Sequence, residues 1–168
     1  MIGVDPPGGV VECGIVAAGL GLDGHAYILE DASLQAPPDR WGAVVVSTYH
    51  RHRVDRVLAE ANYGGDMVES TIRTVDPTIS YKAVSATRGK AVRAEPVAAL
   101  YEQGKVHHVG QFAVLEDEMC FWVPGTGMAS PNRMDALVWV LTELIVDSRY
   151  ARFMDMPQAK VEKSKWRI

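Results

Sequence analysis

The stretch MIGVDPPGGVVECGIVAAGLGLDGHAYIL, residues 1–29, decides the fold class because it holds three β-prone runs in succession. Residues 1–4 predict a short buried strand that ends at Asp5, before a proline- and glycine-rich turn. Runs over residues 10–20 and 25–29 follow, and the two glycines between them are expected to supply the positive φ angles of a tight hairpin. The sheet is therefore expected to begin with three hairpin-connected strands.

Helical and strand patterns alternate in the rest of the chain. Hydrophobic spacing and turn residues predict helices over 39–53, 66–74 and 90–103, strands over 54–60 and 79–84, an extended piece over 105–109 and a turn of helix over 112–119. Gly104 is expected to cap the helix over 90–103, whose least helical position is Pro96.

The last helix is predicted from Ser130 as N-cap and Pro131 as first helical residue to about residue 146. Apolar residues recur in it at spacings of three and four, so one face should pack on the domain. Hairpins followed by alternating helices and strands predict an α/β fold with a mixed β-sheet, three antiparallel strands and then parallel strands, flanked by helices.

Length and composition favour a soluble globular protein. The chain has 168 residues with 48% hydrophobic and 23% charged content, which suits one domain, expected over 1–146, and a charged tail over 147–168, expected to be mobile. No segment has the length of a membrane span or the regions of a signal peptide, which predicts a cytosolic protein with no membrane partner. The net charge of -4 leaves nucleic acid open as a partner, because the basic residues cluster.

Cysteine and histidine usage gives no zinc-site pattern. Cys13 and Cys120 are interpreted as small core residues, kept as thiols in a reducing compartment. The histidine pairs lack cysteines or spaced carboxylates to complete a four-ligand set, so all are interpreted as structural. Aromatic residues of the loops are interpreted as core or rim residues, with base stacking as the alternative: Tyr63, Phe121, Trp122.

Three carboxylates occupy positions suited to chemistry. Asp5 and Glu60 each end an apolar strand before a glycine-containing turn, and Asp135 lies in the first turn of an apolar helix. Should the three converge, their repulsion requires a divalent cation, and oxygen-only ligands favour Mg²⁺ or Mn²⁺ over zinc. Two such ions about 3.5–4 Å apart can activate a water for attack on a phosphodiester. From spacing alone, the alternative is that Asp135 caps its helix and the other two are solvated acids of loops.

Four motifs resemble one known family. Val4-Asp5-Pro6, EANYGG at 60–65 and NRMDALVW at 132–139 resemble the three acidic motifs of the C-terminal nuclease domain of tailed-bacteriophage terminase large subunits. KAVRAEP at 90–96 with YEQGKV at 101–106 also resembles that family, so the similarity spans residues 2 to about 144. The resemblance implies an RNase H-like fold and two-metal cleavage of concatemeric double-stranded viral DNA during packaging, for which we expect little sequence specificity.

The resemblance also implies roles for individual residues. Asp5 would bridge both metal ions, and Glu60 and Asp135 would each hold mainly one. Some relatives carry an acid or a histidine where this chain has Asn132, whose amide oxygen could ligate without adding charge, so the second ion is expected to bind more weakly. Asp66 is a candidate auxiliary ligand, with a solvated residue of a first helical turn as the alternative.

Two clusters of basic residues stand out. Arg88, Lys90 and Arg93 flank a helix start that the resemblance places near the active site, which predicts contacts to DNA phosphates, with a solvated helix end as the alternative. The second cluster is interpreted as a surface face: Arg51, Arg53, Arg56 with His50 and His52.

Full terminases carry an ATPase domain ahead of the nuclease, with a phosphate-binding Gly-x-x-x-x-Gly-Lys-Ser/Thr loop. Here Val84 replaces the first glycine and Ala91 the hydroxyl residue, so this chain is not expected to hydrolyse ATP. The expected partners are an N-terminal ATPase domain of the full protein, the portal and the small terminase subunit, in the cytoplasm of the infected bacterial host. Two alternatives remain: a junction resolvase or transposase-type nuclease, and a portal or motor docking module with weak cleavage.

Overall fold

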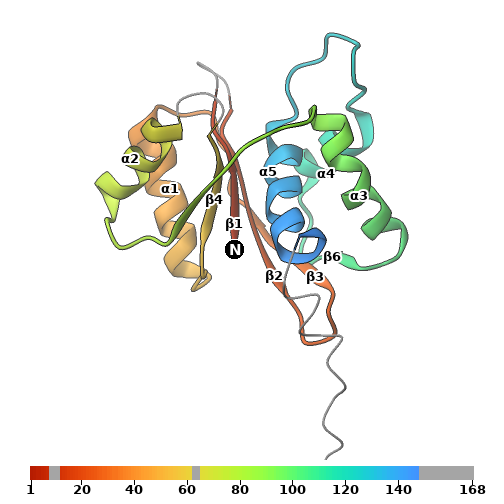
Figure 1. Cartoon of the computed structure of the whole chain (residues 1–168), viewed down its shortest axis with the longest axis horizontal. Helices are drawn as coiled ribbons and strands as arrows, with labels where there is room; N and C mark the ends of the chain where they lie inside the picture. The colour runs from red at the N-terminus through yellow and green to blue at the C-terminus, as the bar shows by residue number, and fades with distance from the viewer. Residues whose placement is uncertain (8–11, 62–64, 148–168) are drawn as a thin grey trace, which may run out of the picture.

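The computed structural model describes residues 1–7, 12–61 and 65–147 and contains a six-stranded mixed sheet in the order β5-β4-β1-β2-β3-β6 (Figure 1). The strands are β1 (Ile2–Asp5), β2 (Gly14–Leu20), β3 (Ala26–Asp31), β4 (Val57–Glu60), β5 (Tyr81–Val84) and β6 (Val106–His108). The first three pair antiparallel, β4 and β6 add in parallel to β1 and β3, and β5 adds in parallel to β4. The predicted α/β class and mixed sheet are confirmed.

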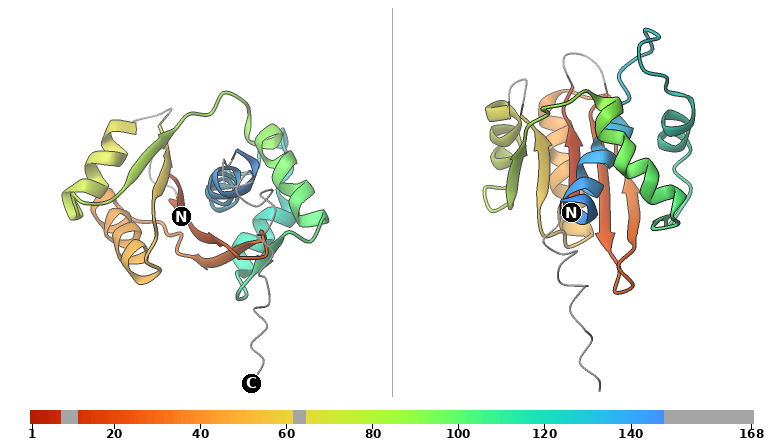
Figure 2. Two further views of the ribbon diagram at one scale, coloured as in Figure 1. Left: turned by 60° about the horizontal axis from the view of Figure 1, so that its bottom comes forward. Right: turned by 45° about the vertical axis from the view of Figure 1, so that its right-hand side comes forward.

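Helices cover both faces of the sheet (Figure 2). One face carries α1 (Pro38–Arg51) and α2 (Gly65–Val75), and the other carries α3 (Lys90–Glu102), α4 (Ala113–Phe121) and α5 (Asn132–Leu141), which continues as a π-helical turn, η1 (Thr142–Val146). No helix within the described ranges is long and apolar enough to cross a membrane.

Alternate side chains of the strands pack into two different cores, one on each face of the sheet. In β2, Ile15 and Ala17 point to the core under α1 and α2, whereas Val16 and Ala18 point to the core around α5. The same alternation in β1 and β4 decides on which side of the sheet the strand-end carboxylates lie.

Two glycines let α5 lie directly on the sheet. A Cβ atom on Gly3 would overlap the carbonyl oxygen of Ala136, and one on Gly14 would overlap the carbonyl oxygen of Asn132. A larger residue at either strand position would push the first turns of α5 outward. These glycines therefore fix how closely the helix that carries Asp135 approaches the strands.

Gly14→Ala is expected to destabilise the protein by about 1–3 kcal/mol, the usual cost of overpacking a core. Gly19→Ala in the same strand is the matched control, because its Cβ would make only an ordinary contact with Leu29, at 3.8 Å. Urea unfolding of both variants measures the difference. Equal losses in the two variants would contradict the role of close approach at Gly14.

The hairpin between β2 and β3 differs from the prediction at one glycine. Only Gly24 has a positive φ, 79°. Gly21 has no positive φ, and a Cβ there would meet the ends of the Asp23 and Tyr27 side chains, which would have to shift. The turn is closed by the Gly21 amide, which donates to the His25 carbonyl at 2.8 Å.

The predicted start of the last helix is also wrong. Pro131, with ψ 73°, occupies the N-cap position, so Ser130 lies outside α5 and no side chain of the N-cap residue caps the helix. The Glu118 carboxylate of α4 accepts the Met134 amide instead, at 3.0 Å. Moreover, α5 buries nearly its whole circumference rather than one face, because it lies between the sheet and helices α3 and α4.

Smaller differences concern segment ends. Residues 52–55 form a turn with Arg53 at φ 50°, so β4 starts three residues later than the predicted 54. Helix α3 continues through Pro96. The proline has no N–H to donate to the Val92 carbonyl, but both residues are exposed. The C-cap glycine is confirmed, since Gly104 has φ 65°. The predicted tail after Asp147 lies outside the described residues.

Candidate active site

Strand alternation places two of the three candidate carboxylates on the α5 side of the sheet. In β1 the residue directly before Asp5, Val4, points to the core under α1 and α2, and in β4 so does Ala59, directly before Glu60. The parallel register of β1 and β4 pairs Val4 with Ala59, so the next residue of each strand lies at the same end of the sheet. Asp135, in the first turn of α5, faces both.

The three carboxylates come together. Asp5, Glu60 and Asp135 each offer an oxygen, and these oxygens lie within 4.8 Å of one another. Asp5 is 6% exposed and Asp135 fully buried. Within the described part of the chain this is the one group of three or more acidic, histidine or cysteine side chains close enough to share an ion. An all-oxygen donor set of this charge fits a hard divalent cation such as Mg²⁺ or Mn²⁺.

Two cationic side chains from the first turn of α3 enter the same site. Lys90 Nζ donates to Asp5 Oδ2 at 2.8 Å and lies 2.9 Å from Asp135 Oδ2. Arg93 Nη2 lies 2.7 and 2.6 Å from the two oxygens of Asp135 and 3.7 Å from Glu60. Its guanidinium also stacks over the Trp139 ring, 4.4 Å from the centroid. The site therefore holds three carboxylates and two cations.

Burial makes Asp5 harder to ionise than a free aspartate. Loss of solvent raises its pKa from 3.8 to about 7, and the charges of Asp135 and Glu60 act in the same direction. Lys90 opposes them and lowers the pKa of Asp5 by its charge and hydrogen bond. An added cation at the carboxylates would act as Lys90 does and favour the ionised form.

The other predicted site residues lie around this cluster. Arg88 is exposed, and its backbone carbonyl accepts a hydrogen bond from Arg93. Asn132 is buried, and its amide nitrogen donates to the Glu12 carbonyl at 2.6 Å. Asp66 is exposed in the first turn of α2. Asp66 is not part of the close group of carboxylates.

An ion-pair network that the sequence did not reveal anchors the start of α5. Arg133 pairs with both oxygens of Glu12 and with Asp31 Oδ2 at 2.6 Å. Glu12 precedes β2 and Asp31 ends β3, so the network ties the first turn of α5 to two strands. Acidic and basic residues this far apart in sequence carry no local signal of their pairing. The network holds the turn from which Asp135 projects.

The remaining histidines and arginines pair on the surface and edges. His52 and Arg51 share Glu30, and Arg56 pairs with Glu143. His25, directly before β3, stacks on His107 of β6, with ring nitrogens 2.7 Å apart. Cysteine predictions were half right: Cys13 is buried, whereas Cys120 is exposed, because α4 packs on the core through Leu115 and Met119 and turns Cys120 away from it.

The sequence model of the terminase RNaseH-like domain family matches residues 2–144. The chain belongs to this family. No curated protein sequence matches it. The large terminase nuclease of thermophilic phage G20c has a similar structure, with a TM-score of 0.61, 17% identity and coverage of 84% of this chain and 80% of that one. The same nuclease has also been solved with bound cobalt, and that structure has a TM-score of 0.61, 18% identity and coverage of 84% and 79%.

A resolvase shares the fold of this terminase domain. RuvC of Thermus thermophilus in complex with a Holliday junction has a TM-score of 0.55 and 18% identity, covering 90% of this chain and 94% of that one. At such identities the likeness shows the fold. Family and fold together place the terminase domain among RNase H-like nucleases, hydrolases that cleave nucleic acid.

Proposed function

We propose that the terminase domain is a divalent-metal-dependent DNA endonuclease that cuts concatemeric viral DNA during packaging, with two metal ions and little sequence specificity. The observation that carries the proposal is the convergence of Asp5, Glu60 and Asp135 from β1, β4 and α5 within 4.8 Å. These three side chains would hold Mg²⁺ or Mn²⁺, with Asp5 shared. When bound, such ions supply an activated water and stabilise charge on the phosphate and the leaving oxygen.

The protein side chains contribute position and charge. Asp135 lies in the first turn of α5, at the positive end of the helix dipole, which attracts negative charge. Lys90 and Arg93 bring two positive charges to the edge of the cluster, where each could contact a phosphate oxygen of the DNA backbone. Arg88, exposed beside them, would extend this phosphate-binding surface. Contacts of this kind position DNA without reading its sequence.

Further parts of the proposal concern auxiliary ligands and context. Asn132 would ligate the weaker ion through its amide oxygen, and Asp66 is a second candidate. The domain, over 1–146, would work in the bacterial host cytoplasm next to an ATPase domain, the portal and the small terminase subunit, and would not hydrolyse ATP itself.

Glu60→Gln and Asp135→Asn are expected to lower Mn²⁺-dependent nicking of a supercoiled plasmid at least tenfold, because each removes a charged metal ligand. Asp39→Asn is the matched control: Asp39 is an exposed acid in the first turn of α1 and should leave the rate unchanged. Chelator should stop cleavage by the unaltered protein. Full activity in both site variants, or cleavage that chelator does not reduce, would remove the basis of the proposal.

The same assay separates the two alternatives. A preference for a four-way junction over linear duplex would indicate a resolvase-type enzyme. Portal binding without cutting at any Mn²⁺ concentration would indicate a docking module.

A further inference from the structure

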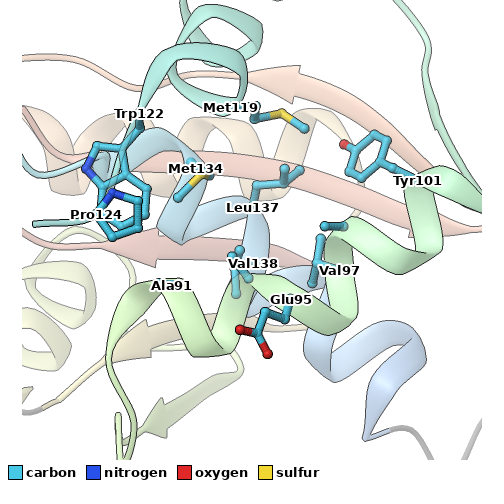
Figure 3. Close-up of a pocket in the computed structure, with 12 residues that line it drawn as sticks. Ala91, Glu95, Val97, Tyr101, Met119, Trp122, Pro124, Met134, Leu137 and Val138 are labelled. Carbon is cyan, nitrogen blue, oxygen red and sulfur yellow. The ribbon is translucent and has the colours of Figure 1, made fainter.

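A pocket of about 330 Å³ lies between α3, α4 and α5 (Figure 3). This volume is at the lower end of the range for small-molecule sites. Its wall is largely apolar, with Val97 and Ala98 from α3, Met119 from α4 and Leu137 from α5. The pocket could therefore enclose one flat, mainly apolar group.

The pocket and the candidate active site share two helices. Helix α5 turns Asp135 to the carboxylates and Met134 and Val138 to the pocket. Helix α3 turns Lys90 to the carboxylates, and the next residue, Ala91, lines the pocket. In Figure 3 the Trp122 ring lies at the same end of the pocket as Ala91. Consecutive residues of α3 and of α5 therefore serve the two sites, and the pocket lining begins one residue after Lys90.

The chemistry of the lining favours a base over a phosphate. None of the lining residues is basic, so nothing in the pocket would neutralise a phosphate. Trp122, which is half-buried, offers an aromatic face for stacking. The Glu95 carboxylate can accept a hydrogen bond from an amino group of a base, whereas the Tyr101 hydroxyl is engaged with His108 Nε2 at 2.7 Å.

We propose that this pocket binds one unstacked base of the DNA strand held at the carboxylates, with Trp122 as its stacking surface. The proposal rests on the proposed function, because DNA must lie at Lys90 for its base to reach Ala91. It adds a base subsite to a site that otherwise contacts only phosphates. Since stacking is tolerant of base identity, such a subsite is compatible with weak sequence preference.

The test is the affinity of the 168-residue chain for a short single-stranded oligonucleotide, measured by fluorescence anisotropy in Ca²⁺ at low salt. Trp122→Ala and Ala98→Phe are expected to weaken binding about tenfold, the first by removing the stacking ring and the second by filling the pocket. Phe121→Ala is the matched control, because Phe121 is the neighbouring aromatic, 67% exposed, and does not line the pocket. It should change the affinity less than twofold.

An oligonucleotide of abasic sites of the same length isolates the base contribution. Unaltered protein and both pocket variants should bind it equally. Loss of abasic binding in the variants, unchanged binding of the normal oligonucleotide, or no binding by the unaltered protein would overturn the proposal. Unchanged binding of the normal oligonucleotide would mean that a side chain of the protein, and not a base, occupies the pocket. Because the measurement involves no cutting, base-dependent binding can succeed where plasmid nicking fails, and the two proposals remain distinguishable.

Discussion

Asp5→Asn is expected to lower metal-dependent DNA cleavage by more than a hundredfold, the largest loss of any single substitution in the terminase domain. Substitution of residues that only hydrogen-bond to metal ligands already lowers metal affinity or activity about 10–100-fold. In the proposed site Asp5 would itself hold the metal ions, so its loss should cost more than the loss of a residue behind a ligand. Plasmid nicking in Mn²⁺, with product measured over several decades of time, gives the rate ratio.

The same substitution should leave the metal-free protein folded and, above neutral pH, more stable. The folded pKa of Asp5, about 7, lies above the ordinary value of 3.8. Its contribution to stability is therefore greatest below pH 3.8 and is lost as the pH rises through about 7. Asparagine has the same shape without the charge, so Asp5→Asn escapes this loss. In chelator at pH 8, the thermal unfolding midpoint of Asp5→Asn should be higher than that of the unaltered protein.

Mn²⁺ should raise the unfolding midpoint of the unaltered protein and have much less effect on Asp5→Asn, because ligand binding to the folded state stabilises it. Asp39→Asn should respond to Mn²⁺ as the unaltered protein does. A variant that unfolds in chelator would show instead that Asp5 is needed for the fold. Cleavage by Asp5→Asn at the rate of the unaltered protein would show that Asp5 is not part of the active site.

The strand-end carboxylates could be predicted because their signals are local. Apolar runs ending at Asp5 and Glu60 fix two positions at one end of the sheet, and period-two alternation fixes their side. The first turn of a buried helix likewise marks Asp135. What local patterns cannot give is that the three meet, since this depends on how closely α5 approaches β1 and β2 at Gly3 and Gly14. Family resemblance supplied that step.

The partners of the charged groups were not predictable for a similar reason. Lys90 and Arg93 were expected to contact phosphate, and the structure shows them in contact with carboxylates that lie over 30 residues away in sequence. Arg133 was not singled out at all, because an arginine in a first helical turn is typical of an exposed face. These pairs join residues that are distant in sequence, so only the tertiary structure shows which carboxylate each cation contacts.

Lys90→Met is expected to change metal binding and cleavage in opposite directions. Lys90 lies within 2.9 Å of both Asp5 and Asp135, so it competes with a metal ion for the same oxygens. Two opposite charges near a protein surface interact by about 4 kcal/mol at 4 Å, and each 1.4 kcal/mol is tenfold in affinity. Removing the ammonium should therefore tighten Mn²⁺ binding at least tenfold by calorimetry. Cleavage should fall, because the proposed phosphate contact is also lost.

Arg88→Met separates these two effects. Arg88 is exposed and contributes only its backbone carbonyl to Arg93, so its side chain can be shortened without disturbing the carboxylates. This variant should bind Mn²⁺ as the unaltered protein does and bind DNA slightly less well. Weaker Mn²⁺ binding in Lys90→Met would show that the ammonium helps to assemble the site rather than competing for it. If both variants bind Mn²⁺ with the affinity of the unaltered protein, Lys90 leaves the carboxylates at no cost in free energy. Its contacts with Asp5 and Asp135 would then not oppose Mn²⁺ binding.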